Sequence, residues 1–226
     1  MNSIENNVQQ APVKLVLFDL LTALLDSWTL WNSVAGSAEM GRTWRMAYLQ
    51  ATYGCGAYRP YETLVEEAAI SVGLGKEAAA NLEAHWTELQ PWPEAKRVLA
   101  ELAPHYKLGV VTNCSEKLGR IAADLLGVSF DVIVTSEQAG FYKPDPEPYR
   151  LALQVAGVKP ADAVFVAGSA YDLFGTQKVG LPTIWHNRIG LDAPAGAPDP
   201  VFMRPTLDSL VQDIATLSRQ RSAGQD

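Results

Sequence analysis

The sequence has few cysteines, no excess of basic charge and no long apolar run. Its two cysteines, Cys55 and Cys114, are too few for a disulfide framework or for a zinc site with four thiolates. The formal net charge of −7 argues against nucleic acid as the main partner, because binding a phosphate backbone needs clustered lysine and arginine. No apolar stretch approaches the roughly 18 residues of a membrane-spanning helix, so we expect no membrane partner.

The first ten residues are polar and contain Glu5, so they do not resemble a secretory signal and are expected to be a frayed leader. With only two cysteines, the chain fits a cytoplasmic protein with reduced thiols. Its 226 residues, 48% of them apolar and 19% charged, are typical of a globular domain with room for a small cap.

Short apolar runs alternate with helical patterns along most of the chain. Such runs indicate strands buried on both faces, and their alternation with helices predicts an α/β fold with a doubly wound parallel sheet. We expect strands at residues 13–18, 108–111, 132–134, 164–167 and 183–185. We expect helices of the core at residues 94–102, 117–126, 146–156, 170–179 and 206–220.

One long stretch, residues 28–92, interrupts this alternation. It contains helical patterns at 44–53, 61–71 and 76–89 and no convincing strand, and Pro91 and Pro93 mark its end. We therefore expect a Rossmann-like core formed by residues 1–27 and 93–226, with residues 28–92 inserted as a helical cap. The segment 187–205 is rich in glycine and proline and is expected to be mostly loop.

Polar side chains cluster where the expected strands end. Ligands of open α/β sheets bind at the carboxyl ends of the strands, so these side chains are expected to converge. Along the chain they are Asp19, Thr112, Asn113, Lys143, Ser169 and Asp172.

The chemistry of this set is coherent. A carboxylate such as Asp19 can act as a nucleophile and form a covalent ester. A neighbouring ammonium, here Lys143, lowers the pKa of a carboxylate by roughly 1–3 units and would keep it ionised. Thr112 and Asn113 offer donors for the attacking carboxylate or for developing charge, and Asp172 can activate the water that opens the ester.

Each of these residues also has an ordinary structural role. Asp19, Thr112 and Asn113 can close turns, and a lone lysine is usually solvated. Ser169 and Asp172 are three residues apart, which resembles an N-terminal helix cap. The combination of several such strand ends in matching order favours a functional site.

Four motifs in this order resemble the haloacid dehalogenase superfamily over about residues 13–210. They are Phe18-Asp19-Leu20-Leu21-Thr22-Ala23-Leu24, Val110-Val111-Thr112-Asn113-Cys114-Ser115, Tyr142-Lys143-Pro144-Asp145-Pro146 and Val166-Ala167-Gly168-Ser169-Ala170-Tyr171-Asp172. The resemblance implies that Asp19 is the nucleophile, and it makes a homodimer possible.

Two positions separate this chain from the phosphatases of the superfamily. Those enzymes usually carry a second aspartate two residues after the nucleophile, where this chain has Leu21, and a metal-binding aspartate where it has Gly168. Without Mg²⁺, a phosphate beside Asp19 would meet a repulsion of roughly 4 kcal/mol at a distance of about 4 Å and an effective dielectric of about 20. This weighs against phosphoryl transfer, and we expect no metal and no cofactor.

The chain is more similar to the (S)-2-haloacid dehalogenase branch, which needs no metal. This resemblance implies that Arg45 binds the substrate or the leaving halide, that Asn113 belongs to the same halide site and that Asp172 positions the hydrolytic water. Thr112 and Ser169 are expected to join the catalytic group. Leu20, Tyr149 and Tyr171 are expected beside the substrate.

The chain departs from that branch at three places. Ala23 stands where a threonine is usual four residues after the nucleophile, and Thr22 lies one place earlier. Leu21 replaces a common aromatic residue. The run Ala167-Gly168-Ser169 stands where Ser-Ser-Asn is usual.

Together the residues and the resemblance favour hydrolytic displacement at C2 of a small 2-haloacid-like substrate. Three alternatives stay open. The chain could be a Mg²⁺-dependent phosphatase acting on a small phosphate ester, or a non-catalytic relative that binds a ligand. It could also hydrolyse another bond to carbon, such as that of a strained ring amine beside a carboxylate.

Overall fold

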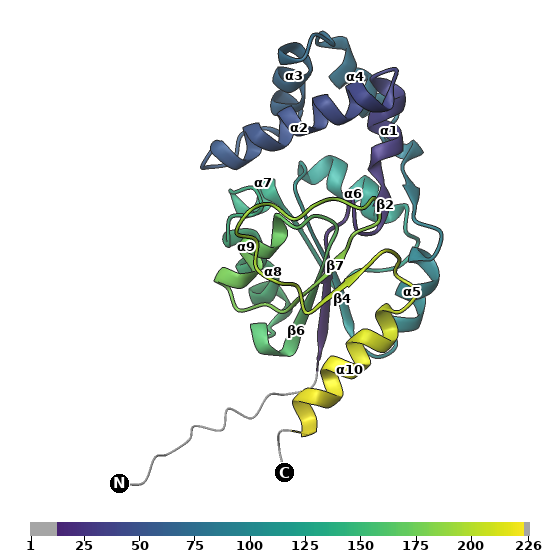
Figure 1. Cartoon of the computed structure of the whole chain (residues 1–226), viewed down its shortest axis with the longest axis vertical. Coiled ribbons are helices and arrows are strands. Elements are labelled where there is room, and N and C mark those ends of the chain that lie inside the picture. The colour runs from purple at the N-terminus through teal and green to yellow at the C-terminus, as the bar shows by residue number, and fades with distance from the viewer. Residues whose placement is uncertain (1–12, 224–226) are drawn as a thin grey trace.

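The computed structural model of the chain describes residues 13–223 (Figure 1). The expected leader, residues 1–10, lies outside the described residues. Within them, six strands form a parallel sheet in the order β5-β4-β1-β6-β7-β8. Their bounds are β1 (Leu15–Phe18), β4 (Lys107–Thr112), β5 (Val132–Thr135), β6 (Ala163–Ala167), β7 (Thr183–His186) and β8 (Phe202–Arg204).

The central strand β1 aligns the carboxyl ends of its two neighbours. Phe18, its last residue, lies opposite Val110 of β4 and Val166 of β6. The chain winds from β1 outward through β4 and β5, and then returns through β6 to the other side of β1. This reversal beside β1 is the topological switch point at which doubly wound sheets bind ligands, and it confirms the predicted α/β class.

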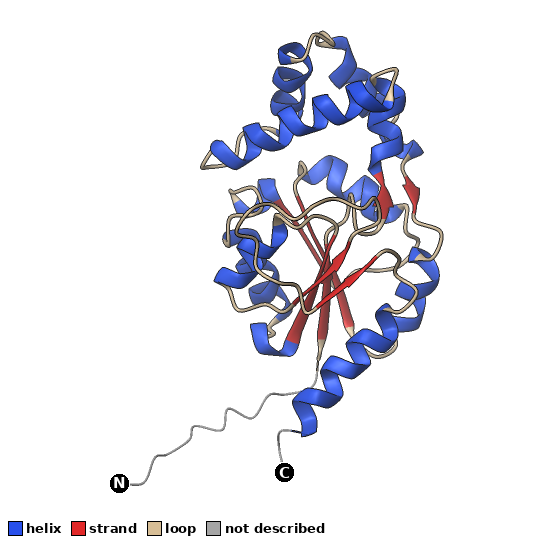
Figure 2. Cartoon of the chain, viewed as in Figure 1, coloured by secondary structure: helices blue, strands red, loops and turns tan. Residues whose placement is uncertain are grey.

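Helices cover both faces of the sheet (Figure 2). Their bounds are α5 (Ala95–Leu102), α6 (Glu116–Asp124), α7 (Ser136–Ala139), α8 (Glu147–Ala156), α9 (Asp172–Lys178) and α10 (Leu210–Ala223). Successive residues of β1 point to opposite faces, as in any strand. Val16 and Phe18 pack in the hydrophobic cluster with α5, α6 and α10. Leu15 and Leu17 pack in a second cluster with α8 and α9.

The prediction of a loop over residues 187–205 is wrong at its end, where β8 extends the sheet. β8 pairs with β7 alone and forms the edge of the sheet. Its middle residue, Met203, is 55% exposed, and the residues on either side of it are half-buried. The apolar run here, Val201-Phe202-Met203, is only three residues long and lies between Pro200 and Arg204-Pro205 in a segment rich in glycine and proline, so the strand was not predicted.

Four helices lie together above the carboxyl ends of the strands (Figure 1). They are α1 (Ser27–Val34), α2 (Ala38–Gly54), α3 (Tyr61–Ser71) and α4 (Glu77–Ala84). A short antiparallel pair, β2 (Leu25–Asp26) and β3 (Gln90–Pro91), joins them to the sheet on the way in and on the way back.

Two local predictions for this region are wrong. We expected no strand in residues 28–92, yet β3 pairs with β2, and a two-residue strand is too short to show a pattern. The helix α1 was also not expected. It begins after Asp26, whose side chain accepts a 3.1 Å hydrogen bond from the backbone N–H of Thr29.

The helical region and the sheet share one hydrophobic cluster, which runs from β1 and β4 up to Trp31, Trp44 and Tyr61. Tyr48 of α2 also donates a 3.1 Å hydrogen bond to the backbone oxygen of Asn113, just after β4. The four helices are therefore packed onto the strand ends. Among the described helices, none combines the length and the apolar character that a membrane span requires.

Candidate active site

Asp19 is the first residue after β1 and is buried, with 7% of its surface exposed. The chain turns sharply here, and the turn directs three donors at one carboxylate oxygen. Oδ2 accepts hydrogen bonds from the backbone N–H of Thr22 at 2.8 Å, from Thr22 Oγ1 at 2.5 Å and from the backbone N–H of Ala23 at 3.2 Å. The other oxygen, Oδ1, faces the ammonium of Lys143 at 2.8 Å.

Lys143 lies between two buried carboxylates. Its Nζ is 2.8 Å from Asp19 Oδ1 and 3.1 Å from Asp172 Oδ1. The side chain of Asn113 fixes the loop that carries this lysine. It donates a 2.9 Å hydrogen bond to the backbone oxygen of Lys143 and accepts one of 2.7 Å from its backbone N–H. The expected halide ligand Asn113 therefore also holds the lysine in place.

Charge and burial act in opposite directions on the pKa values of these groups. Burial alone would raise the pKa of Asp19, but the charge and hydrogen bond of Lys143 and the bonds from Thr22 leave it lowered. Burial would lower the pKa of Lys143, yet the two carboxylates raise it. For Asp172, burial and the nearby Asp19 outweigh Lys143, so its pKa is raised. Asp19 and Lys143 are thus a stable ion pair.

Arg45 of α2 brings a second buried cation, with 6% of its surface exposed. Its Nη1 donates a 2.7 Å hydrogen bond to Ser27 Oγ, and its guanidinium carbon lies 4.1 Å from the centre of the Trp28 ring. In the part of the chain that the structure describes, no carboxylate lies within 4.0 Å of this guanidinium. Burial lowers the pKa of Arg45, but an arginine stays charged.

A cavity of about 260 Å³ joins these groups between the helices and the strand ends. The expected site residues that line it are Asp19, Arg45, Asn113, Lys143, Ser169, Tyr171 and Asp172. Tyr149 lies behind Asp172 in the core and donates a 2.6 Å hydrogen bond to its Oδ1. Ser169 Oγ accepts a 3.3 Å hydrogen bond from the backbone N–H of Tyr171.

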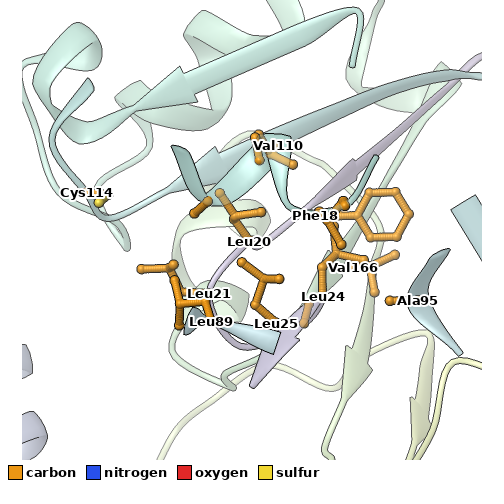
Figure 3. Packing of buried hydrophobic residues seen from close by; sticks show 14 of the residues in the cluster. Phe18, Leu20, Leu21, Leu24, Leu25, Leu89, Ala95, Val110, Cys114 and Val166 are labelled. Atoms are coloured by element: carbon orange, nitrogen blue, oxygen red, sulfur yellow. The ribbon is translucent and has the colours of Figure 1, made fainter. Parts of the chain in front are cut away.

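The structure places three expected site residues away from the cavity lining, namely Tyr149 behind Asp172, Leu20 and Thr112. Leu20 is fully buried in the hydrophobic cluster beside β1 (Figure 3), and the next residue, Leu21, lines the cavity instead. Thr112 is also fully buried, and among the described residues its Oγ1 has no hydrogen-bond partner. All three residues therefore lie next to the site without forming its surface.

Several residues of the site have roles that the sequence pattern does not indicate. Thr22 holds Asp19, and the sequence hinted at it only as a threonine one place earlier than usual. Trp28 stacks on Arg45, and nothing in the sequence distinguished it from a packing tryptophan. Tyr53 of α2 stacks on Tyr171 with ring centres 4.6 Å apart, which closes one side of the cavity between cap and core.

The residues at the strand ends do not fit the Mg²⁺ site of a phosphatase. A Cβ atom on Gly168 would lie 2.0 Å from Thr22 Oγ1, so a carboxylate at this position has no room. The ammonium of Lys143 lies between the two carboxylates, where it would repel a cation. Within residues 13–223, no group of three or more acidic, histidine or cysteine side chains is arranged to hold a metal.

The fold and the site define a capped, doubly wound α/β protein with a buried cluster of lysine and carboxylates. A model of haloacid dehalogenase-like hydrolases matches residues 16–186, and the chain belongs to this family of hydrolases.

The individual relatives share about a quarter to a third of their aligned residues with this chain. The chain is 28% identical over 200 residues to an (S)-2-haloacid dehalogenase of Xanthobacter autotrophicus, a match that covers 80% of this chain and 78% of that protein. A crystal structure of an L-2-haloacid dehalogenase superposes with a TM-score of 0.81 at 26% identity, covering 91% of this chain and all of that one. The pyrophosphatase PpaX of Bacillus cereus is 32% identical, but over 119 residues, which cover 50% of this chain and 54% of the relative.

Proposed function

We propose that this chain is a metal-independent hydrolase that removes halide from C2 of small (S)-2-halo carboxylic acids through an ester on Asp19. One observation carries the proposal: the cavity contains a lysine-paired aspartate and a second buried cation, Arg45, which pairs with no carboxylate of the described residues. A buried charge that no opposite charge balances is costly, so Arg45 favours an anion in the cavity. The similarity to (S)-2-haloacid dehalogenases along most of the chain supports the same chemistry.

The two oxygens of Asp19 differ in a way that suits a nucleophile. Oδ2 is held by three donors, whereas within residues 13–223 Oδ1 is bound by Lys143 alone. In the first step Oδ1 attacks C2 from the side opposite the halogen and forms a carbon–oxygen bond. The carbon–halogen bond breaks and the halide leaves with its electron pair, so the configuration at C2 is inverted. Arg45 stabilises the departing anion.

Water opens the ester in the second step. Asp172 accepts a proton from the water, whose oxygen adds to the carbonyl carbon of Asp19. The bond between that carbon and Oδ1 then breaks, Oδ1 takes the proton from Asp172, and the 2-hydroxy acid leaves with that oxygen. The oxygen of the water remains in the carboxylate of Asp19. Lys143 stays charged throughout and keeps the regenerated carboxylate of Asp19 ionised.

The direct test is chloride release from (S)-2-chloropropionate in the presence of EDTA. We expect chloride and (R)-2-hydroxypropionate in equal amounts from the wild type, and neither from Asp19→Asn. The matched control is Asp208→Asn, because Asp208 is exposed and pairs with Arg97 on the surface. In a single turnover in H₂¹⁸O, the label should enter Asp19. Absence of halide release, with Mg²⁺-dependent release of phosphate from phosphate esters, would overturn the proposal in favour of a phosphatase.

A further inference from the structure

The turn that holds Asp19 Oδ2 is itself fixed from two distant parts of the chain. Trp92, at the return from the helical region, donates a 2.9 Å hydrogen bond from its indole to the backbone oxygen of Thr22. His186, at the end of β7, contacts the backbone oxygen of Ala23 through Nδ1 at 2.9 Å. A carbonyl only accepts, so this nitrogen carries the proton. The N–H groups of the turn are therefore held in place before any substrate binds.

Gly168 is what allows the turn to pack so closely on β6. A Cβ atom at residue 168 would lie 2.0 Å from Thr22 Oγ1 and 2.5 Å from the backbone nitrogen of Ala23. Contacts this short are impossible, so even alanine would displace the turn. The hydroxyl of Thr22 and the missing side chain of Gly168 thus occupy one space and depend on each other.

We propose that Thr22 and Gly168 form a matched pair that builds the oxyanion site of this enzyme, with Thr22 Oγ1 and the N–H groups of Thr22 and Ala23 as its donors. The inference rests on the proposed function, because it concerns the ester on Asp19. Oδ2 becomes the carbonyl oxygen of that ester and takes the negative charge when water adds. Thr22 is then a catalytic residue, and Gly168, Trp92 and His186 are positioning residues.

The two chemical steps make opposite demands on this site. During attack on C2 the carboxylate of Asp19 loses negative charge, so donors on Oδ2 stabilise the starting state and give no acceleration. During ester hydrolysis charge develops on Oδ2, so the same donors stabilise the transition state. Removing the hydroxyl of Thr22 should therefore slow the second step and leave the first unchanged or faster. A purely structural role would slow both steps together.

The test follows both steps separately in Thr22→Val, which keeps the shape of the side chain and removes the donor. In rapid-quench experiments with (S)-2-chloropropionate, we expect a chloride burst of one equivalent at the wild-type rate. Slow turnover should follow, reduced about 10²-fold, as for the loss of one oxyanion donor elsewhere. The peptide containing Asp19 should carry the ester mass. Thr22→Ser should restore turnover to within a few fold.

Thr52→Val is the matched control, because Thr52 is also buried but donates its hydroxyl to Leu49 within α2. It should show wild-type rates for both steps. Equal slowing of burst and turnover in Thr22→Val, or no change in either, would overturn the inference. If no ester forms on Asp19 in the wild type, both the proposed function and this inference are wrong. Normal wild-type turnover with an unaffected Thr22→Val overturns the inference alone.

The pairing with Gly168 is tested by a double-mutant cycle. Gly168→Ala should slow ester hydrolysis by displacing the donors of the turn. Because both changes act on one site, their effects on this step should not add, and the double variant should be only slightly slower than the slower single variant. Multiplying effects would contradict the pairing. Circular dichroism of each variant shows whether it folds. If Gly168→Ala does not fold, the two rates of Thr22→Val alone test the oxyanion site.

Discussion

Tyr149 donates a 2.6 Å hydrogen bond to Oδ1 of Asp172, the same oxygen that lies 3.1 Å from Nζ of Lys143. Tyr149 is fully buried and packs edge-on against Phe165, with ring centres 5.2 Å apart. One oxygen of Asp172 is therefore held from the core, which orients the other for a water in the cavity.

Tyr149→Phe tests this orientation. The hydrogen bond from Tyr149 lowers the pKa of Asp172 against the larger effect of burial, so its loss should raise that pKa further. A hydrogen bond to a charged group contributes about 1.5–3 kcal/mol, so ester hydrolysis at neutral pH should fall about tenfold or more. The acid limb of the pH profile of ester hydrolysis should move to higher pH in this variant. Tyr106→Phe, at a half-buried tyrosine outside the cavity lining, is the control, and identical pH profiles of turnover in both variants would rule out the role.

Lys143→Met should remove both activity and stability. It leaves the carboxylates of Asp19 and Asp172 buried without their shared cation, which typically costs 3–5 kcal/mol of unfolding free energy. The loss should shrink as pH falls, because a protonated carboxyl no longer needs a partner. Lys14→Met breaks a lysine–aspartate pair of similar length, 2.9 Å to Asp162, but the Lys14 side chain is 55% exposed.

We therefore expect this control to lose less than about 1 kcal/mol. Urea unfolding of both variants and the wild type at pH 7, and again under mildly acidic conditions, measures the difference. Equal losses in the two variants would show that burial of the Lys143 cluster does not matter.

The two carboxylates predict different acid limbs for the two steps. The pKa of Asp19 is lowered from 3.8, so the nucleophile stays ionised as pH falls through that value. The pKa of Asp172 is raised from 3.8, so this base takes up its proton at higher pH. As pH is lowered, turnover should fail before ester formation does, and the ester should accumulate. Rapid-quench chloride release across the acid range measures both limbs, and coincident limbs would contradict the assignment of Asp172.

The sheet was predictable because its buried strands are continuous apolar runs that end at polar residues. Residues 15–18 run straight into Asp19, and residues 163–167 are followed by Gly168 and then Ser169. β8 was missed because the apolar run there is only three residues long and lies in a segment rich in glycine and proline. Homodimer formation and a cytoplasmic location stay predictions from the sequence.

Within the site, the charged residues were predictable from the sequence, but the residues that hold them in place were not. Asp19, Lys143 and Asp172 follow strands in a recognisable order, so their convergence could be expected. Thr22 could not be assigned, because its role depends on the shape of a turn and on the missing side chain of Gly168, 146 positions away in the sequence (168 − 22). For Leu20 and Leu21, the turn after β1 decides which one faces the cavity, and two adjacent leucines carry no signal for that choice.

Arg45 offers the sharpest test of an anion site, because its charge is buried and pairs with no carboxylate in the described part of the chain. Arg45→Met removes a cation that is costly in the empty cavity and useful only when an anion is bound. Without halide, we expect the variant to be about as stable as the wild type in urea. Bromide at ten times its dissociation constant should stabilise the wild type by about 1.4 kcal/mol and leave Arg45→Met unchanged.

Arg97→Met is the control, because Arg97 pairs on the surface with Glu101 and Asp208 and does not line the cavity. It should respond to bromide as the wild type does. Bromide should also inhibit turnover of the wild type, since it competes for the position that the leaving halide occupies. If bromide stabilised Arg45→Met as strongly as the wild type, the halide would have to leave by another route, and the direction of attack on C2 would need to be reassigned.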